Sequence, residues 1–127
     1  MTTLEEASQE FYAALNTVLG GDAAPMLDAW SHADDVTYMS PFGELLTGWD
    51  AVRASWLSQA DAHLGGRVDG EDVRLVASPT LGVAVGFERG SVDIDGVATR
   101  VDIRATSTYR LEDGRWAMIG HHTDPLG

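Results

Sequence analysis

The sequence predicts an α+β fold in which three helices precede one curled antiparallel sheet. Apolar residues recur at helical spacing in the first half of the chain, whereas the chain after Gly70 alternates as strands do. Two hairpin signals, Asp95-Gly96 and Glu112-Asp113-Gly114, interrupt this second half. The chain has 127 residues, 44% of them hydrophobic, so we expect a single domain over 1–127.

Three helices are expected before the sheet. The first covers 3–19 and begins with a capping box of the Thr-x-x-Glu type. A second, shorter helix follows, capped by Asp22 and ending near Ser31. The third begins at Thr47, whose hydroxyl we expect to cap it, and ends at the Leu64-Gly65-Gly66 stop. These helices must cover one face of the sheet.

Five strands are expected. A short one over 36–39 lies between the second and third helices and is stopped by a proline. The others cover 72–78, 83–94, 97–111 and 115–123, joined by tight turns into an antiparallel meander.

Composition excludes several classes of partner. The formal charge is −12, from 20 acidic residues against eight basic ones, all of them arginine, so a polyphosphate would be repelled and we expect no nucleic-acid binding. No apolar run is long enough to cross a bilayer, and the acidic N-terminus does not look like a secretion signal. We therefore expect a cytoplasmic protein with no membrane partner. The absence of cysteine excludes disulfides and thiolate chemistry.

Three segments carry a resemblance to a known superfamily. They are Ala33-Asp34-Asp35-x-Thr37, Gly48-x-x-Ala51-Val52, and Gly114-Arg115-Trp116 followed by a histidine-rich final strand. On these segments the chain resembles the nuclear-transport-factor-2-like superfamily over nearly its whole length, and within it the SnoaL-like and ketosteroid-isomerase-like proteins. The resemblance implies a cone-shaped fold, with three N-terminal helices packed on a strongly curved antiparallel sheet around a deep apolar pocket, commonly in a homodimer.

The catalytic residues of the ketosteroid isomerases do not carry over. Ser40 stands where those enzymes have a proton-shuttling Asp, just before the Pro-Phe-Gly corner. Thr106 stands near the position of their protonated Asp, and Tyr12 lies about two residues from the position of their Tyr. A hydroxyl with an alkaline pKa cannot do the work of a carboxylate base, so ketosteroid isomerase activity is disfavoured.

The histidine-rich end is the densest polar cluster in an otherwise apolar strand. Neighbours on a strand face opposite ways, so only one of His121 and His122 can face the pocket. The alignment on Gly-Arg favours His121, whereas the histidine common in SnoaL-like endings matches His122, and one bulge would exchange them. The inward imidazole is a candidate general acid or base, oriented by Asp124 or Asp102. The alternative is a core histidine bonded to a backbone carbonyl.

Arg104 and Thr106 lie two residues apart on one strand and therefore on one face. The isomerase alignment points that face inward, which would let Arg104 bind a carboxylate, phenolate or enolate. The alternative for Arg104 is an internal ion pair.

Aromatic and hydroxyl side chains complete the predicted pocket. The residues expected to bind a ligand are Tyr12, Trp30, Tyr38, Ser40, Phe42, Trp56 and Thr106. The catalytic candidates are His121, His122, Arg104 and Asp124.

No metal and no cofactor is expected, because adjacent histidines diverge on a strand and cannot converge on one ion. Two functions stay open. One is a cofactor-independent acid–base enzyme of the cyclase, isomerase, dehydratase or hydrolase type, acting on a small apolar or polyketide-like molecule. The other is a noncatalytic dimeric module for ligand binding or association.

Overall fold

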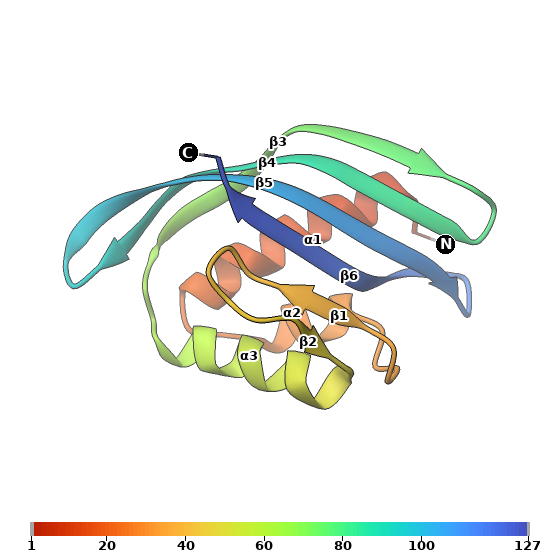
Figure 1. The fold of residues 1–127 in the computed structure, drawn as a ribbon, viewed down its shortest axis with the longest axis horizontal. Helices are drawn as coiled ribbons and strands as arrows, with labels where there is room; N and C mark the ends of the chain where they lie inside the picture. Colours follow the sequence, from red (N-terminus) through yellow and green to blue (C-terminus); the bar gives the residue numbers. More distant parts are fainter. Residues whose placement is uncertain (1, 127) are drawn as a thin grey trace.

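A computed structural model describes residues 2–126 and shows three helices packed against one six-stranded sheet (Figure 1). The elements are α1 (Leu4–Leu19), α2 (Ala24–Ala29), β1 (Thr37–Met39), β2 (Leu46–Thr47), α3 (Trp49–Asp61), β3 (Gly66–Ala77), β4 (Leu81–Ile94), β5 (Val97–Glu112) and β6 (Arg115–Pro125). The strand order is β2-β1-β6-β5-β4-β3. The predicted α+β class is confirmed, and the sheet does not close into a barrel.

The sheet is mixed, which corrects the expectation of a purely antiparallel one. Strands β3 to β6 form the predicted antiparallel meander. Strand β1 pairs in parallel with β6, with Tyr38 opposite His121, and antiparallel with the short strand β2. Two parallel strands are joined by a long connection and not by a hairpin, so no local turn signal in the sequence indicates this pairing.

Helix α1 begins as predicted and α3 does not. The Thr3 hydroxyl accepts from the Glu6 backbone N–H at 3.1 Å, and the Glu6 carboxylate accepts in return from the Thr3 N–H. At α3 the cap position is Gly48, with φ of 90°, and Thr47 belongs to β2. The Gly48 N–H donates to the Val36 carbonyl, so the strand pairing, and not a side chain, fixes the start of α3.

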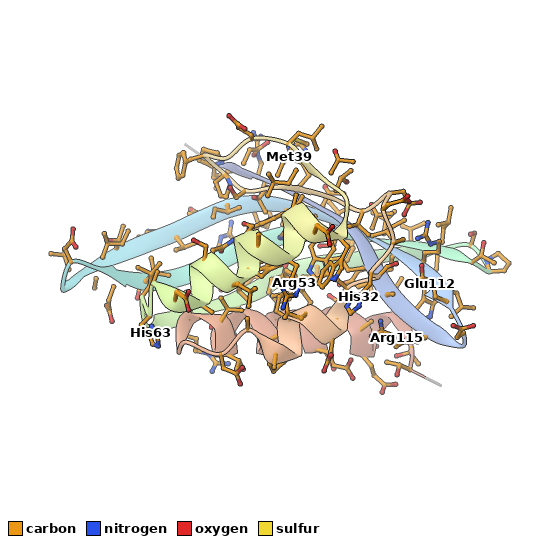
Figure 2. All side chains as sticks on the ribbon, turned by 90° about the horizontal axis from the view of Figure 1, so that it is seen from below. His32, Met39, Arg53, His63, Glu112 and Arg115 are labelled. Carbon is orange, nitrogen blue, oxygen red and sulfur yellow. The ribbon has the colours of Figure 1, made fainter. Side chains whose placement is uncertain are left out.

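The helices lie on one face of the sheet, and the core lies between the two layers. Figure 2 shows α1 and α3 side by side across this inner face. Phe11 of α1, Trp30 after α2, Trp56 of α3 and Met118 of β6 are each at most 1% exposed and belong to one apolar cluster. Burial of such large side chains stabilises the fold by about 1.5–3 kcal/mol each.

Strand β3 forms one edge of the sheet and is held by α1. The Asn16 side chain accepts from the Val68 N–H at 2.8 Å and donates to the Val68 carbonyl at 2.9 Å. This amide therefore pairs with the backbone of β3 as a neighbouring strand would, and it ties the helix to the sheet edge next to the cavity described below.

A β-bulge in β6 determines which residues of the last strand face inward. Thr108 pairs with Gly120, but the next pair is Tyr109 with Met118, which leaves Ile119 as the extra residue. Met118 and His121 consequently both point into the core, although they lie three residues apart.

Candidate functional site

A cavity of about 170 Å³ lies between the inner face of the sheet, β1 and the end of α3. Its walls are mostly apolar and come from α1, α3 and strands β3 to β5. The polar side chains on its lining are those of Tyr38, Ser40, Gln59, Glu88, His121 and Thr123. No arginine lines it, so among residues 2–126 its ionisable groups are one carboxyl group, one imidazole and one phenol.

Glu88 and His121 form a buried pair on this cavity. Glu88 is 6% exposed and His121 is 4% exposed, and the Glu88 Oε2 lies 2.9 Å from the His121 Nε2. The other ring nitrogen, Nδ1, lies 2.8 Å from the Ser107 hydroxyl. The register of the sheet explains the contact, because Ser107 and His121 are direct partners across β5 and β6. Both nitrogens of the imidazole are therefore engaged by protein groups.

This arrangement holds a proton between Glu88 and His121. The short contact needs a proton on Nε2 or on the carboxyl group. Ser107 donates to Nδ1 when the ring is neutral and accepts from Nδ1 when the ring is protonated, so its hydroxyl suits both forms. The pair can take up one further proton while the Ser107 contact is kept, which suits a proton-transfer group.

Tyr12 reaches the same carboxylate from α1. Its hydroxyl donates to the Glu88 Oε2 at 3.2 Å. Burial and the neighbouring Glu88 charge raise the pKa of Tyr12, so the phenol keeps the proton that it donates. Both hydrogen bonds fall on Oε2, and Oε1 has no hydrogen-bond partner among residues 2–126.

Gly70 makes this contact possible. It is the partner of Glu88 across β3 and β4, and a Cβ atom there would lie 2.5 Å from the ring of Tyr12. The missing side chain lets the Tyr12 ring pass over β3 to Glu88.

Tyr38 supplies a phenol on the lining of the cavity. Burial raises the pKa of Tyr38 to about 12. The Gln59 side-chain amide donates to the Tyr38 oxygen at 3.1 Å, so the phenol's own proton remains to be donated elsewhere. The Tyr38 ring stacks on Trp56, with ring centroids 4.8 Å apart, and this contact fixes its orientation.

The structure corrects the orientation predicted for Arg104 and Thr106. Both point to the outer face of the sheet, where Arg104 pairs with Asp124 at 2.7 Å. His122, opposite Thr106 on β6, is also exposed. Arg104 therefore does not reach the cavity, and Asp124 does not orient His121; Glu88 is the carboxylate that does. An exposed arginine keeps its hydration, and the inner positions of β5 over 101–109 are left to uncharged residues.

The other predicted ligand-binding residues divide between cavity, core and surface. Tyr38, Ser40 and Trp56 line the cavity. Trp30 is fully buried away from it, and Phe42 is 90% exposed on the loop between β1 and β2. Tyr12 reaches the cavity only through Glu88 and itself lines an open groove between α1 and β3.

The sequence analysis did not identify Glu88, because the alternation of apolar residues in β4 predicts the wrong inner face for this strand. Val83, Val85 and Phe87 alternate with small residues, which predicts an inner face for the large apolar side chains and an outer face for Glu88. The structure has the reverse, because α1 packs closely over Gly82, where a Cβ atom would lie 2.7 Å from Leu4. A row of small residues on one face was the available signal for a closely packed helix.

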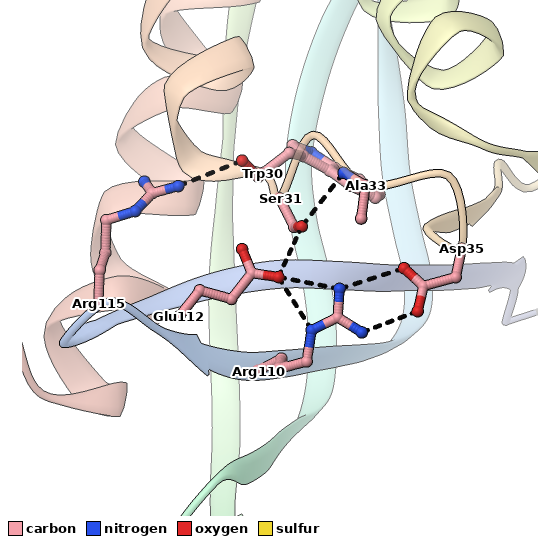
Figure 3. Close-up of polar contacts among 7 residues, drawn as sticks. All are labelled: Trp30, Ser31, Ala33, Asp35, Arg110, Glu112 and Arg115. Atoms are coloured by element: carbon pink, nitrogen blue, oxygen red, sulfur yellow. Dashed lines mark hydrogen bonds and ion pairs between the residues drawn. The ribbon is translucent and has the colours of Figure 1, made fainter.

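A second polar cluster lies at the opposite end of β5 (Figure 3). Asp35 contacts both terminal nitrogens of Arg110, at 2.8 and 3.1 Å, and Glu112 accepts from Arg110 Nε at 2.9 Å. The Ser31 hydroxyl donates to Glu112 at 2.9 Å. These contacts join the turn before β1 to the end of β5. They also engage all three nitrogens of the Arg110 guanidinium, which therefore has no pair of N–H donors free for an anionic ligand.

Two further observations bear on the sequence predictions. Within residues 2–126, no group of three or more histidine or acidic side chains converges as a metal site would require. None of the helices in this part of the chain has the length and apolar character needed to cross a bilayer.

Comparison with known proteins gives structural relatives across the whole chain. A proposed calcium/calmodulin-dependent protein kinase type II association domain from Thiobacillus denitrificans is 30% identical, with a TM-score of 0.84, and the match covers 100% of this chain and 98% of that one. A proposed dehydratase of the NTF2-like family from Streptomyces avermitilis is 20% identical, with a TM-score of 0.82 over 94% of this chain and 91% of that one.

A proposed ketosteroid isomerase from Parabacteroides distasonis is more distant. It is 15% identical, with a TM-score of 0.67 over 90% of this chain and 83% of that one. The last two likenesses show the fold alone. No curated protein sequence matches the chain.

A model of the SnoaL-like domain matches residues 4–124, which include every helix and all but the last residue of the sheet. The family resemblance carried by the turn before β1, the start of α3 and the histidine-rich end is confirmed. The chain belongs to the SnoaL-like domain family.

Proposed function

We propose that this chain binds a small carbonyl compound in its cavity and moves a proton at the carbon next to the carbonyl group, without a cofactor. The observation that carries this proposal is Glu88, a carboxylate 6% exposed on an apolar cavity with both of its hydrogen bonds on one oxygen. A carboxylate held in this way has a free oxygen with which to take a proton from a ligand.

The proposed roles follow from the contacts. Glu88 Oε1 takes the proton from carbon, and the electron pair of the broken C–H bond forms an enolate. The Tyr38 O–H donates to the enolate oxygen and stabilises the charge that develops there. Glu88 then returns the proton to a different carbon, which completes an isomerisation, or to a departing hydroxyl group, which completes a dehydration.

His121 acts through Glu88 in this scheme. Because Ser107 and Glu88 occupy both of its nitrogens, the imidazole has no free atom for the ligand. It holds the carboxylate in place through the contact between Nε2 and Oε2. His121 is therefore a positioning residue, and Glu88 is the proposed catalytic base.

Hydrogen exchange tests the proposal before a natural substrate is known. A panel of small ketones is incubated with the protein in D₂O, and deuterium incorporation beside the carbonyl is followed by NMR. We expect the wild-type protein to accelerate exchange for at least one ketone and Glu88→Gln to lose on the order of 10²–10⁴ of that rate. His122→Gln changes an exposed histidine on the outer face of β6 to the same residue, so it is the control and should keep the rate. Equal rates for wild type and a folded Glu88→Gln would overturn the assignment.

We also propose association as a second function, because the most similar of the relatives reported above is described as an association domain. The outer face of the sheet supports it. Val76 and Val85 are 71% and 44% exposed there, and helices cover only the opposite face. Two copies of this chain packed through these faces would bury the exposed apolar side chains.

A further inference from the structure

Gln59 of α3 lies on the lining of the cavity and takes no part in the proton transfer proposed above. Its amide nitrogen, Nε2, lies 3.1 Å from the Tyr38 oxygen and 3.2 Å from the Ser55 Oγ. An amide nitrogen only donates hydrogen bonds, so both hydroxyl oxygens act as acceptors in these contacts. The contact with Gln59 therefore limits how the Tyr38 hydroxyl can use its single proton.

The ring of Tyr38 is held in one orientation. It stacks on Trp56, with ring centroids 4.8 Å apart and an interplanar angle of 14°, and it makes a T-shaped contact with Trp30 at 6.0 Å. Tyr38 is 5% exposed. Reorientation of a ring packed in this way would break these contacts, so the O–H bond is the part of the side chain that remains free to turn.

The Tyr38 proton has one favourable direction. A proton aimed at Gln59 would face the N–H group that donates to the same oxygen. A proton aimed away from Gln59 leaves a lone pair of the oxygen to accept that hydrogen bond. Among residues 2–126 no acceptor takes the Tyr38 proton, and Tyr38 itself lines the cavity. The proton is therefore left for a ligand.

From these contacts we infer that Gln59 is a positioning residue that determines specificity. It makes Tyr38 a donor toward the cavity, so the ligand atom bound there is a hydrogen-bond acceptor. The inference rests on the proposed function for the identity of this acceptor, a carbonyl oxygen. The hydrogen bond from Gln59 also polarises the Tyr38 O–H bond, which strengthens its donation to the charge of an enolate. Ser55, one helical turn before Gln59, accepts from the same amide and helps to hold it.

Infrared spectroscopy tests the direction of this hydrogen bond without a ligand. The C–O stretching frequency of a tyrosine is lower when its oxygen accepts a hydrogen bond and higher when the hydroxyl only donates one. Spectra recorded with and without Tyr38→Phe isolate the Tyr38 band. We expect Gln59→Met, which keeps the length of the side chain and removes its donor, to raise this frequency. An unchanged or lower frequency would show that Gln59 does not donate to Tyr38 and would overturn the inference.

Two ring compounds of the same shape test the consequence for specificity. A cavity of about 150 Å³ holds one benzene molecule, so cyclohexanone and methylenecyclohexane suit the cavity of about 170 Å³. The ratio of their affinities, measured by NMR titration at pH 8, reports the hydrogen bond to the carbonyl oxygen. Gln59→Glu puts an ionised carboxylate where the donor was, and this carboxylate takes the Tyr38 proton. We expect the ratio to fall by about tenfold.

Two further variants separate the direction of the hydrogen bond from the shape of the side chain. Gln59→Met removes the donor without offering an acceptor and should change the affinity ratio by less than about threefold. Gln9→Glu makes the same chemical change at an exposed residue of α1 that does not line the cavity, and should leave the ratio unchanged. Equal losses in Gln59→Glu and Gln59→Met, or an unchanged ratio in Gln59→Glu, would refute the inference.

The inference and the proposed function fail separately. The exchange experiment with Glu88→Gln tests proton transfer, whereas the infrared shift needs neither a ligand nor turnover. Exchange together with the wrong infrared shift would leave Glu88 as the base and remove the role of Gln59. The expected shift and ratio without exchange would support the role of Gln59 in a pocket that binds ketones and catalyses nothing.

Discussion

Glu88 lies on the lining of the cavity, and no arginine of the described residues lines the cavity to offset the charge of an added anion. A ligand carboxylate placed there would lose its hydration and face a like charge. The cavity should therefore discriminate between ligands of the same shape by their charge. This contrasts with the anionic ligand that an inward Arg104 would have favoured.

We predict that phenylacetone binds at least about tenfold more tightly than phenylacetate at neutral pH, a difference of about 1.4 kcal/mol. The two probes have the same number of non-hydrogen atoms and differ in charge. Glu88→Gln should narrow the difference by improving phenylacetate binding, and isothermal titration measures both. Arg104→Gln removes a cation on the outer face and should leave the ratio unchanged; a collapse of the ratio in that variant would contradict the outward placement of Arg104.

At the level of the elements, the contacts between Asp35 and Arg110 fasten the turn before β1 to β5. The Arg110 hydrogen bonds lower the pKa of the exposed Asp35 carboxyl below its usual 3.8. A carboxyl group with a lowered pKa in the folded state adds stability above the pKa of the unfolded chain. That stability is lost as pH falls through the folded-state value.

We predict that Asp35→Asn lowers the free energy of unfolding at pH 7 and that the difference from wild type shrinks when the pH is lowered from 7 to 2, through the lowered pKa of Asp35. Urea unfolding followed by circular dichroism at both pH values measures this. The neighbouring Asp34, which makes no ion pair with the described residues, provides the control change Asp34→Asn. A difference that stayed constant down to pH 2 would mean that Asp35 acts through its packing and not through its charge.

The sequence located the helices, strands and turns more accurately than it predicted which face of each strand points into the core. Capping and hairpin signals are local, so α1 and the turns at Asp95-Gly96 and Asp113-Gly114 could be located from neighbouring residues. Which face of a strand points inward depends on the elements that pack against it. The inward side of β4 follows from the close approach of α1, for which the small residues that alternate along β4 were the local signal.

The candidate site shows the same limit. Strand parity allowed only one inward histidine, for which the alignment on Gly-Arg favoured His121 and the SnoaL-like ending favoured His122, and the structure places His121 on the inner face. Its partners Glu88, Ser107 and Tyr12 come from β4, β5 and α1, and only the register of the sheet brings them together. On β5 the spacing placed Arg104 and Thr106 on one face and the family alignment pointed that face inward, whereas the structure turns it outward.

For the whole molecule, the exposed outer face predicts self-association. Light scattering should give twice the 13.6 kDa mass of the chain, and Val85→Glu should reduce it to one copy because it buries charges at the centre of the interface. Leu45→Glu, a change at a residue 58% exposed outside the sheet, is the control and should leave the dimer intact. A wild-type protein that stayed monomeric at high concentration would argue against association through this face.

The parallel pairing of β1 with β6 has a consequence for the order in which the protein can assemble. Tyr38 and His121 are direct neighbours in the sheet but lie about 80 residues apart along the chain. During translation the helices and β1 leave the ribosome first, and β1 has no parallel partner until the final strand is released. The ring of Tyr38 and the imidazole of His121 consequently meet only in the last step of folding. Pulse-labelling of nascent chains should therefore find the amides of α1 protected before those of β1, and refolding should be slow for a chain of this length.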